Sequence, residues 1–199
     1  MPAIEHGAYR FNVATAGELP EIFRLRYQIY VTEFGFESRQ DHPQGWETDP
    51  WDGNAIHFVC RHNHELIGTL RLVLNKAIGL PVQRAAALEI PASPPAAEIS
   101  RLAISPRFRK GKTGNDLVAL GLFQQMYHES KRRHIAHWYF ITEEWISKTL
   151  QNMGFKFTRI GAPVSYHGCR TPYSSHVSHI EERLAQAAPE VYGLMTAGL

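Results

Sequence analysis

Three carboxylates crowd a short segment that also contains two tryptophans: residues 46 to 52 read Trp-Glu-Thr-Asp-Pro-Trp-Asp. Neighbouring anions repel one another unless cations face them or water surrounds them. The predicted cations are three arginines, each inside an otherwise apolar periodic segment: Arg26, Arg71 and Arg101. Together with Glu98, these groups predict a polar cluster assembled from four parts of the chain, and this cluster is the candidate active site.

The segment that carries Arg26 is predicted to be a helix that begins at a capping box. Thr15 precedes Glu18 by three residues, so their side chains can satisfy each other's backbone N–H groups. Apolar periodicity continues to about Phe34, stops at Gly35, and places Arg26 on the buried face. Two interpretations of Arg26 stay open: an arginine that extends from the edge of the core, or one that is paired with a carboxylate from another element.

Residues 36–54 lack periodicity, and we expect them to fold over a site. Long loops in compact domains are commonly functional or disordered. Aromatic residues argue against disorder, and this loop contains Phe36, Trp46 and Trp51. Strands are predicted next over residues 55–61 and 65–74, joined by a turn at residues 62–64, and Arg71 lies in the second of them.

Residues 97–104 are predicted to form a strand that contains both Glu98 and Arg101. In a regular strand these two side chains would point to opposite faces, because the side-chain period is two. If both serve one site, the strand must bulge near Ser100.

A basic loop with glycine follows this strand and leads into a helix predicted from about residue 115 to residue 131. Such a junction offers backbone N–H groups and the positive end of a helix dipole, which suit a pyrophosphate or an acidic carrier. The pattern is weak, because most strand-loop-helix junctions bind nothing. The candidate binding residues are Arg107, Arg109, Lys110, Lys112 and Gly114.

The remaining chain predicts a strand over residues 135–142, a helix over 144–153, strands over 155–160 and 164–167, and a helix over 174–187. This order indicates an α/β (α+β) fold with a mixed, mostly antiparallel sheet flanked by helices. A chain of 199 residues that is 44% hydrophobic can bury a core as one domain over residues 1–199.

Composition excludes several classes of protein. A net charge of +2 gives no general nucleic-acid signature, and two cysteines are too few for a disulfide framework. No stretch reaches transmembrane length, so we expect a cytoplasmic protein without a membrane segment. We expect no bound metal, and we interpret most of the eleven histidines as surface or loop residues.

The charged positions, taken together, resemble the signature of the acyl-homoserine lactone synthases and the N-acyl amino acid synthases of the GNAT superfamily. The matching residues are Arg26-x-x-x-Tyr30, Phe36, Glu47-x-Asp49-x-x-Asp52, Gly68-x-x-Arg71 and Glu98-x-x-Arg101. Three further segments are more similar to N-acyl amino acid synthases and to acyltransferases associated with the exosortase (PEP-CTERM) system: residues 98–109, 168–172 and 189–192.

This resemblance implies transfer of a long-chain fatty acyl group from an acyl carrier protein or CoA thioester to the α-amine of an amino acid. The thioester is then a co-substrate, and no bound cofactor is expected. Lys112 occupies the place of the first glycine in the usual GNAT loop, which favours acyl carrier protein as the donor. Alternatives are an acyl-homoserine lactone synthase, a short-chain acyl-CoA acetyltransferase, and a non-catalytic module that binds acyl carrier protein.

For the site, the resemblance and the chemistry together imply several roles. Glu98 is the predicted general base, or alternatively part of the scaffold, and it acts with Arg101, Glu47 and Asp49. Arg26, Asp52 and Arg71 are predicted to order the loop, through the pairs Asp52–Arg71 and Asp49–Arg26. The acyl chain, the oxyanion and the acceptor are assigned to Tyr30, Phe36, Trp46, Trp51, Leu102, Ala103 and Arg170.

Overall fold

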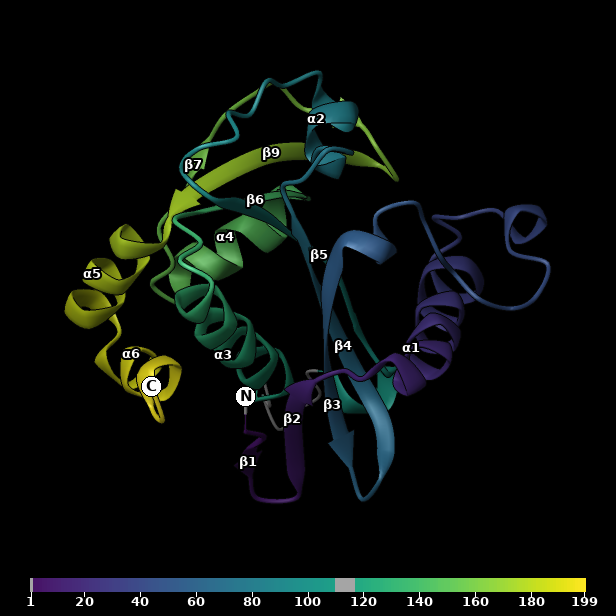
Figure 1. Ribbon diagram of the computed structural model, residues 1–199, viewed down its shortest axis with the longest axis horizontal. Coiled ribbons are helices and arrows are strands. Elements are labelled where there is room, and N and C mark those ends of the chain that lie inside the picture. The colour runs from purple at the N-terminus through teal and green to yellow at the C-terminus, as the bar shows by residue number, and fades with distance from the viewer. Residues whose placement is uncertain (1, 110–116) are drawn as a thin grey trace. The chain divides into compact units, whose positions relative to one another are not determined.

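The protein was analysed as a computed structural model, which describes residues 2–109 and 117–199 (Figure 1). Nine strands of these residues form a sheet in the order β1-β2-β3-β4-β5-β6-β9-β7, and β8 pairs with β9. The pairing of β5 with β6 is parallel. Together with six α-helices in the same residues, this arrangement confirms the expected mixed α/β fold with a mostly antiparallel sheet.

The chain divides into two compact units, which are described separately. The first unit comprises Met1–Leu72 and Arg101–Glu129, and the second comprises Val73–Ser100 and Ser130–Leu199. The first unit contains all or most of β1 (Ile4–His6), β2 (Tyr9–Val13), α1 (Leu19–Arg26), β3 (Ala55–His62), β4 (Glu65–Leu74) and α3 (Leu117–Arg132). β5 (Ala96–Ile104) begins in the second unit and ends in the first.

The core of the first unit lies between its strands and α3. Phe11 on β2 and Cys60 on β3 are register partners, so both point to the same face of the sheet. A Cβ on Gly121 of α3 would lie 2.4 Å from the Phe11 ring, and a Cβ on Gly68 of β4 would lie 3.0 Å from Val118. Both glycines are therefore sites where helix and sheet approach closely.

The second unit is built around the pairing of β6 with β9. Trp138 on β6 is buried, and its indole N–H donates to the Ser130 hydroxyl at 3.0 Å. The elements that lie wholly in this unit are α2 (Pro81–Ala86), β6 (His137–Thr142), α4 (Glu144–Asn152), β7 (Thr158–Arg159), β8 (Val164–Ser165), β9 (Cys169–His176), α5 (Val177–Ala187) and α6 (Pro189–Thr196).

Several local predictions were correct. Glu18 Oε2 accepts the backbone N–H of Thr15 at 2.8 Å, so the capping box is present. The hairpin β3–β4 turns at Asn63 and His64, and both have positive φ angles, as a two-residue turn of this twist requires. Within the described residues, no helix is both long and apolar enough to cross a membrane.

Other predictions were wrong. The predicted end of the first helix near Phe34 was correct, but its second half, Tyr27–Glu33, is a π-helix, which was not predicted. Residues 174–176 were predicted to open a helix but instead end β9, because they pair with residues 137–139 of β6. β1, α2 and α6 were not predicted from the sequence.

Candidate active site

Arg26 lies at the centre of the contacts made by residues 46–52, which we call the acidic segment. Its side chain is fully buried, at 0% exposure. Its Nε donates to Glu47, and Nη1 and Nη2 donate to the two Asp52 oxygens at 2.6 and 3.2 Å. Because a buried guanidinium is costly unless paired and hydrogen-bonded, these contacts decide between the two interpretations of Arg26 in favour of the paired one.

Arg71 supplies the second cation, from β4. Its Nη1 lies 2.7 Å from Asp49 Oδ1 and 2.7 Å from Asp52 Oδ1. The predicted pair Asp52–Arg71 is therefore present. The predicted pair Asp49–Arg26 was wrong, because Asp49 contacts Arg71 and Arg101 instead.

Arg101 supplies the third cation, at an interruption of β5. Its φ of 51° lies in the left-handed region, which interrupts the strand one residue from the expected bulge. The guanidinium is 3.0 Å from Glu47, 3.1 Å from Glu37 and 3.3 Å from Asp49, and it lies 5.5 Å from the centre of the Tyr30 ring. A strained backbone conformation thus places Arg101 among three carboxylates.

The acidic segment is also held by its own backbone. Asp52 Oδ2 accepts the N–H of Asp49 at 2.8 Å, and Asp49 Oδ1 accepts the N–H of Trp51 at 2.9 Å. The N–H of Glu47 donates to the carbonyl of Phe23 on α1 at 3.1 Å. The carboxylates are therefore fixed in place before any substrate arrives.

The pKa values follow from these contacts. Burial alone would raise the pKa of Glu47, but the guanidiniums of Arg26 and Arg101 lower it to about 2. Asp52 is likewise buried, and Arg26 and Arg71 hold its pKa well below the usual range. Glu47 and Asp52 are anionic at neutral pH and are poor general bases, because a base needs a pKa near the working pH.

The cluster gathers carboxylates and guanidiniums from several elements. Among the described residues, its ion pairs join four carboxylates to three guanidiniums: Glu37, Glu47, Asp49 and Asp52 to Arg26, Arg71 and Arg101. Glu37 was not among the predicted site residues. Glu47 is sealed at 1% exposure, whereas the side chains of Asp49 and Glu37 are 13% and 21% exposed.

His57 on β3 is a second member that the sequence analysis missed. It is buried, its Nε2 lies 3.7 Å from Asp52 Oδ1, and within the described part of the chain neither ring nitrogen has a hydrogen-bond partner. Burial, with Arg26 and Arg71, lowers its pKa to about 4 against the opposing effect of Asp52. A polar residue inside the apolar run Ala-Ile-His-Phe-Val was the available signal, and it is the same signal that identified the arginines.

Aromatic side chains border the Arg101 end of the cluster. The Tyr30 hydroxyl donates to the Leu102 carbonyl at 2.8 Å, and Phe36 lies 5.1 Å from the Phe34 ring in a stacked arrangement. Phe34 and Leu102 are 47% and 39% exposed, which is unusual for apolar side chains of this size. Ala103 is buried beneath them in a small core with Leu25 and Ile29.

Two predicted aromatic residues occupy more peripheral positions. Trp46 lies under the Arg24 guanidinium, 5.6 Å from ring to cation. Trp51 is partly buried and contributes its backbone N–H to the loop.

Glu98 belongs to the second unit. It is buried at 1% exposure, and its Oε2 accepts the backbone N–H of Val82 at the start of α2, at 2.6 Å. This hydrogen bond fixes the position of the carboxylate. Arg170, also in the second unit, lies 3.7 Å from Glu143.

The predicted carrier-binding residues divide into two groups. Arg107 pairs with Glu65, and Arg109 pairs with Glu33 and lies 5.1 Å from the centre of the Phe34 ring. Lys110, Lys112 and Gly114 lie outside the described residues.

Comparison with known proteins gives a match to one sequence family and several similar folds. Residues 25–119 match the sequence family described as an acetyltransferase (GNAT) domain. The fold resembles FeeM, an N-acyl amino acid synthase from uncultured soil microbes, with a TM-score of 0.67 and 18% identity over 88% of this chain and 94% of FeeM.

Two acyl-homoserine lactone synthases have a similar fold. LasI gives a TM-score of 0.68 and 18% identity over 85% of this chain and 90% of LasI. BjaI, a CoA-dependent enzyme solved with SAM and isopentyl-CoA, gives a TM-score of 0.64 and 21% identity over 87% of this chain and 85% of BjaI. The fold of this chain is therefore close to those of the N-acyl amino acid and acyl-homoserine lactone synthases.

Proposed function

We propose that this protein is an acyltransferase that moves a long-chain fatty acyl group from a carrier-protein or CoA thioester to the α-amine of an amino acid. The observation that carries the proposal is the gathering of carboxylates in the cluster, of which Asp49 and Glu37 are partly exposed. An amino acid arrives with an ammonium group, which these two carboxylates can attract.

The reaction is aminolysis of a thioester. The ammonium first loses a proton, the amine nitrogen then bonds to the acyl carbon, and the C–S bond breaks to release the thiol, which takes up a proton. Because Glu47 and Asp52 are poor bases, we assign proton removal to Glu98, whose carboxylate is held by the Val82 N–H. Backbone N–H groups around Leu102 and Ala103, next to the interruption at Arg101, are the proposed oxyanion donors.

The exposed aromatic surface supports an apolar substrate. Tyr30, Phe34, Phe36 and Leu102 offer apolar area beside Arg101, and this suits part of a fatty acyl chain. We keep Arg170 as the proposed partner of the acceptor carboxylate, for which it would exchange Glu143.

Docking of an acyl carrier protein rests on weaker support. Arg107 and Arg109 already pair with glutamates, so an acidic carrier would have to compete with Glu65 and Glu33. The exposed pair Arg107–Glu65 is the easier of the two to exchange, because exposed ion pairs are worth little.

Mass spectrometry of lipid extracts from a bacterial host that expresses the protein tests the proposal. We expect long-chain N-acyl amino acids with the wild type and with Glu89→Gln, an exposed glutamate that serves as the control. Glu98→Gln keeps the shape but removes the base, and we expect at least a hundredfold less product.

Other outcomes would contradict the proposal in different ways. An N-acyl homoserine lactone as product would establish the alternative function that the folds of LasI and BjaI also support. Products with short acyl chains alone would indicate an acetyltransferase of small amines. Full activity of Glu98→Gln would retain the reaction but remove Glu98 as its base.

A further inference from the structure

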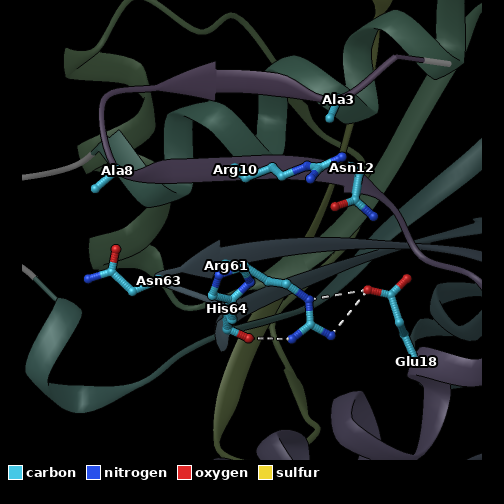
Figure 2. Close-up of a pocket in the computed structure, with 8 residues that line it drawn as sticks. All are labelled: Ala3, Ala8, Arg10, Asn12, Glu18, Arg61, Asn63 and His64. Atoms are coloured by element: carbon cyan, nitrogen blue, oxygen red, sulfur yellow. Dashed lines mark hydrogen bonds and ion pairs between the residues drawn. The ribbon is translucent and has the colours of Figure 1, made fainter.

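A cavity of 530 Å³ lies in the first unit between the β1–β2 hairpin, the β3–β4 turn and the start of α1 (Figure 2). Its polar lining residues are Arg10, Asn12, Glu18, Arg61, Asn63 and His64. None of these residues takes part in the ion pairs of the arginine–carboxylate cluster. The volume is in the range of cavities that hold small ligands.

Two arginines stand side by side in this cavity. Arg10 on β2 and Arg61 on β3 are register partners, so both side chains lie on the same face of the sheet. Phe11 and Cys60, the next pair along, point to the opposite face, which α3 covers. Like charges directly opposite each other on neighbouring strands are destabilising unless anions compensate them.

Within residues 2–109 and 117–199, only Arg61 of these two arginines has its positive charge compensated by carboxylates. Arg61 donates to Glu18 at 3.2 and 3.3 Å, to Glu21, and to the His64 carbonyl at 2.8 Å, so all of its nitrogens are used (Figure 2). Arg10 has no hydrogen bond, ion pair or ring contact within the described residues. Glu5 is its register partner on β1, and Glu18 lines the same cavity, but Arg10 forms an ion pair with neither of them in the structure.

We propose that this cavity binds the carboxylate or phosphate group of a small ligand, with Arg10 as the cationic anchor. A guanidinium with free donors matches the planar or tetrahedral oxygens of such groups. Asn12 and Asn63 add side-chain amides to the lining. Arg61 also lines the cavity, and its ion pairs with Glu18 and Glu21 hold its side chain in place. The site is separate from the proposed acyl-transfer function and does not depend on it.

Titration calorimetry with inorganic phosphate and with succinate, at constant ionic strength, tests the proposal. We expect saturable binding of at least one of the two anions, with one site per chain, and the stronger of them identifies the ligand class. Arg10→Gln should weaken this binding about tenfold or more, because a charge-assisted contact is lost. Glu5→Gln should strengthen it, because the anion that competes for Arg10 is removed.

Arg183→Gln provides the matched control, since it removes an exposed arginine of α5 and changes the net charge by the same amount. Its affinity for either anion should equal that of the wild type. The proposal is overturned if neither anion binds the wild type saturably, or if Arg10→Gln and Arg183→Gln bind with equal affinity. Far-ultraviolet circular dichroism of each variant separates loss of binding from loss of folding.

Discussion

Asp52 connects the acidic segment to two different cations. Its Oδ1 lies 2.6 Å from Arg26 Nη1 and 2.7 Å from Arg71 Nη1, and its Oδ2 caps the backbone of Asp49. His57 lies beside the same oxygen and stays neutral, because burial disfavours its charged form and protonation would add a positive charge near Arg26 and Arg71. Because one carboxylate accepts hydrogen bonds from more than one arginine, the loss of that carboxylate affects several arginines.

Glu47→Gln tests how much the protein depends on such a carboxylate. The substitution leaves Arg26 buried without its Glu47 charge, and we expect the free energy of unfolding to fall by about 3–5 kcal/mol. Glu65→Gln is the matched control, because Glu65 and Arg107 form an exposed pair, and its loss should cost less than about 1 kcal/mol. Urea unfolding measures both values, and equal small losses would contradict a buried, interdependent cluster.

The elements around the site were predictable where a local rule determines them. The capping box at Thr15 and the turn at Asn63 and His64 depend on neighbouring residues alone, and both are present. The π-helix after Arg26 and the strand β9 were not predictable, because each depends on contacts with residues far along the chain. β9 pairs with β6 across the 26 residues 143–168, whereas its own sequence contains Pro172 and little alternation.

The candidate site was likewise predictable in part from the sequence. Polar residues in apolar runs correctly marked Arg26, Arg71 and Arg101 as members of the cluster. Their choice of partners could not be predicted, since Asp49 and Asp52 differ in sequence position but not in chemistry. Which carboxylate reaches which arginine depends on how the loop folds.

The positive φ of Arg101 in β5 leads to a prediction about backbone strain. Arg101→Gly and Arg101→Ala both remove the ion pairs with Glu37, Glu47 and Asp49. In an ordinary strand alanine would be the more stable of the two, but a φ of 51° penalises any Cβ. We expect the glycine variant to be more stable than the alanine variant by about 1 kcal/mol in urea unfolding. The opposite order would show that the left-handed conformation depends on the arginine side chain.

The contact between α3 and β2 makes a second prediction about elements. Gly121→Ala would place a Cβ 2.4 Å from the Phe11 ring, so helix and strand must separate or Phe11 must change rotamer. We expect a loss of about 1–3 kcal/mol by thermal or urea unfolding. Gly193→Ala in α6 meets nothing within 4 Å and should stabilise by about 0.4–1 kcal/mol. Stabilisation of both variants would mean that α3 packs less closely than the structure shows.

The net charge of the whole chain is +2, but the acidic segment, residues 46–52, contains three carboxylates and no cation. The acidic segment would repel itself in isolation, and its partners come from α1, β4 and β5. Folding therefore lowers the pKa of Glu47 and Asp52, and burial lowers the pKa of His57. All three shifts mean that the folded state binds fewer protons than the unfolded chain, so stability falls as the pH falls.

The pKa shifts indicate which of these three groups is the first to lower the stability as the pH falls. The pKa of His57 is about 4 in the folded protein against 6.5 in the unfolded chain, so its contribution is complete above pH 6.5 and is lost as the pH falls toward 4. Between pH 7 and pH 5 this histidine alone should lower the free energy of unfolding by about 2 kcal/mol. Glu47 and Asp52 contribute only below about pH 4.5, where their unfolded forms become protonated.

His57→Gln separates this effect from that of the other histidines. The variant removes the titrating ring, so its loss of stability between pH 7 and pH 5 should be about 2 kcal/mol smaller than that of the wild type. His179→Gln removes an exposed histidine and should keep the wild-type slope. Urea unfolding at several pH values gives the three slopes. A wild-type slope in His57→Gln would show that His57 has nearly the same pKa in the folded and unfolded states, so that Asp52 offsets the effects of burial and of the two arginines.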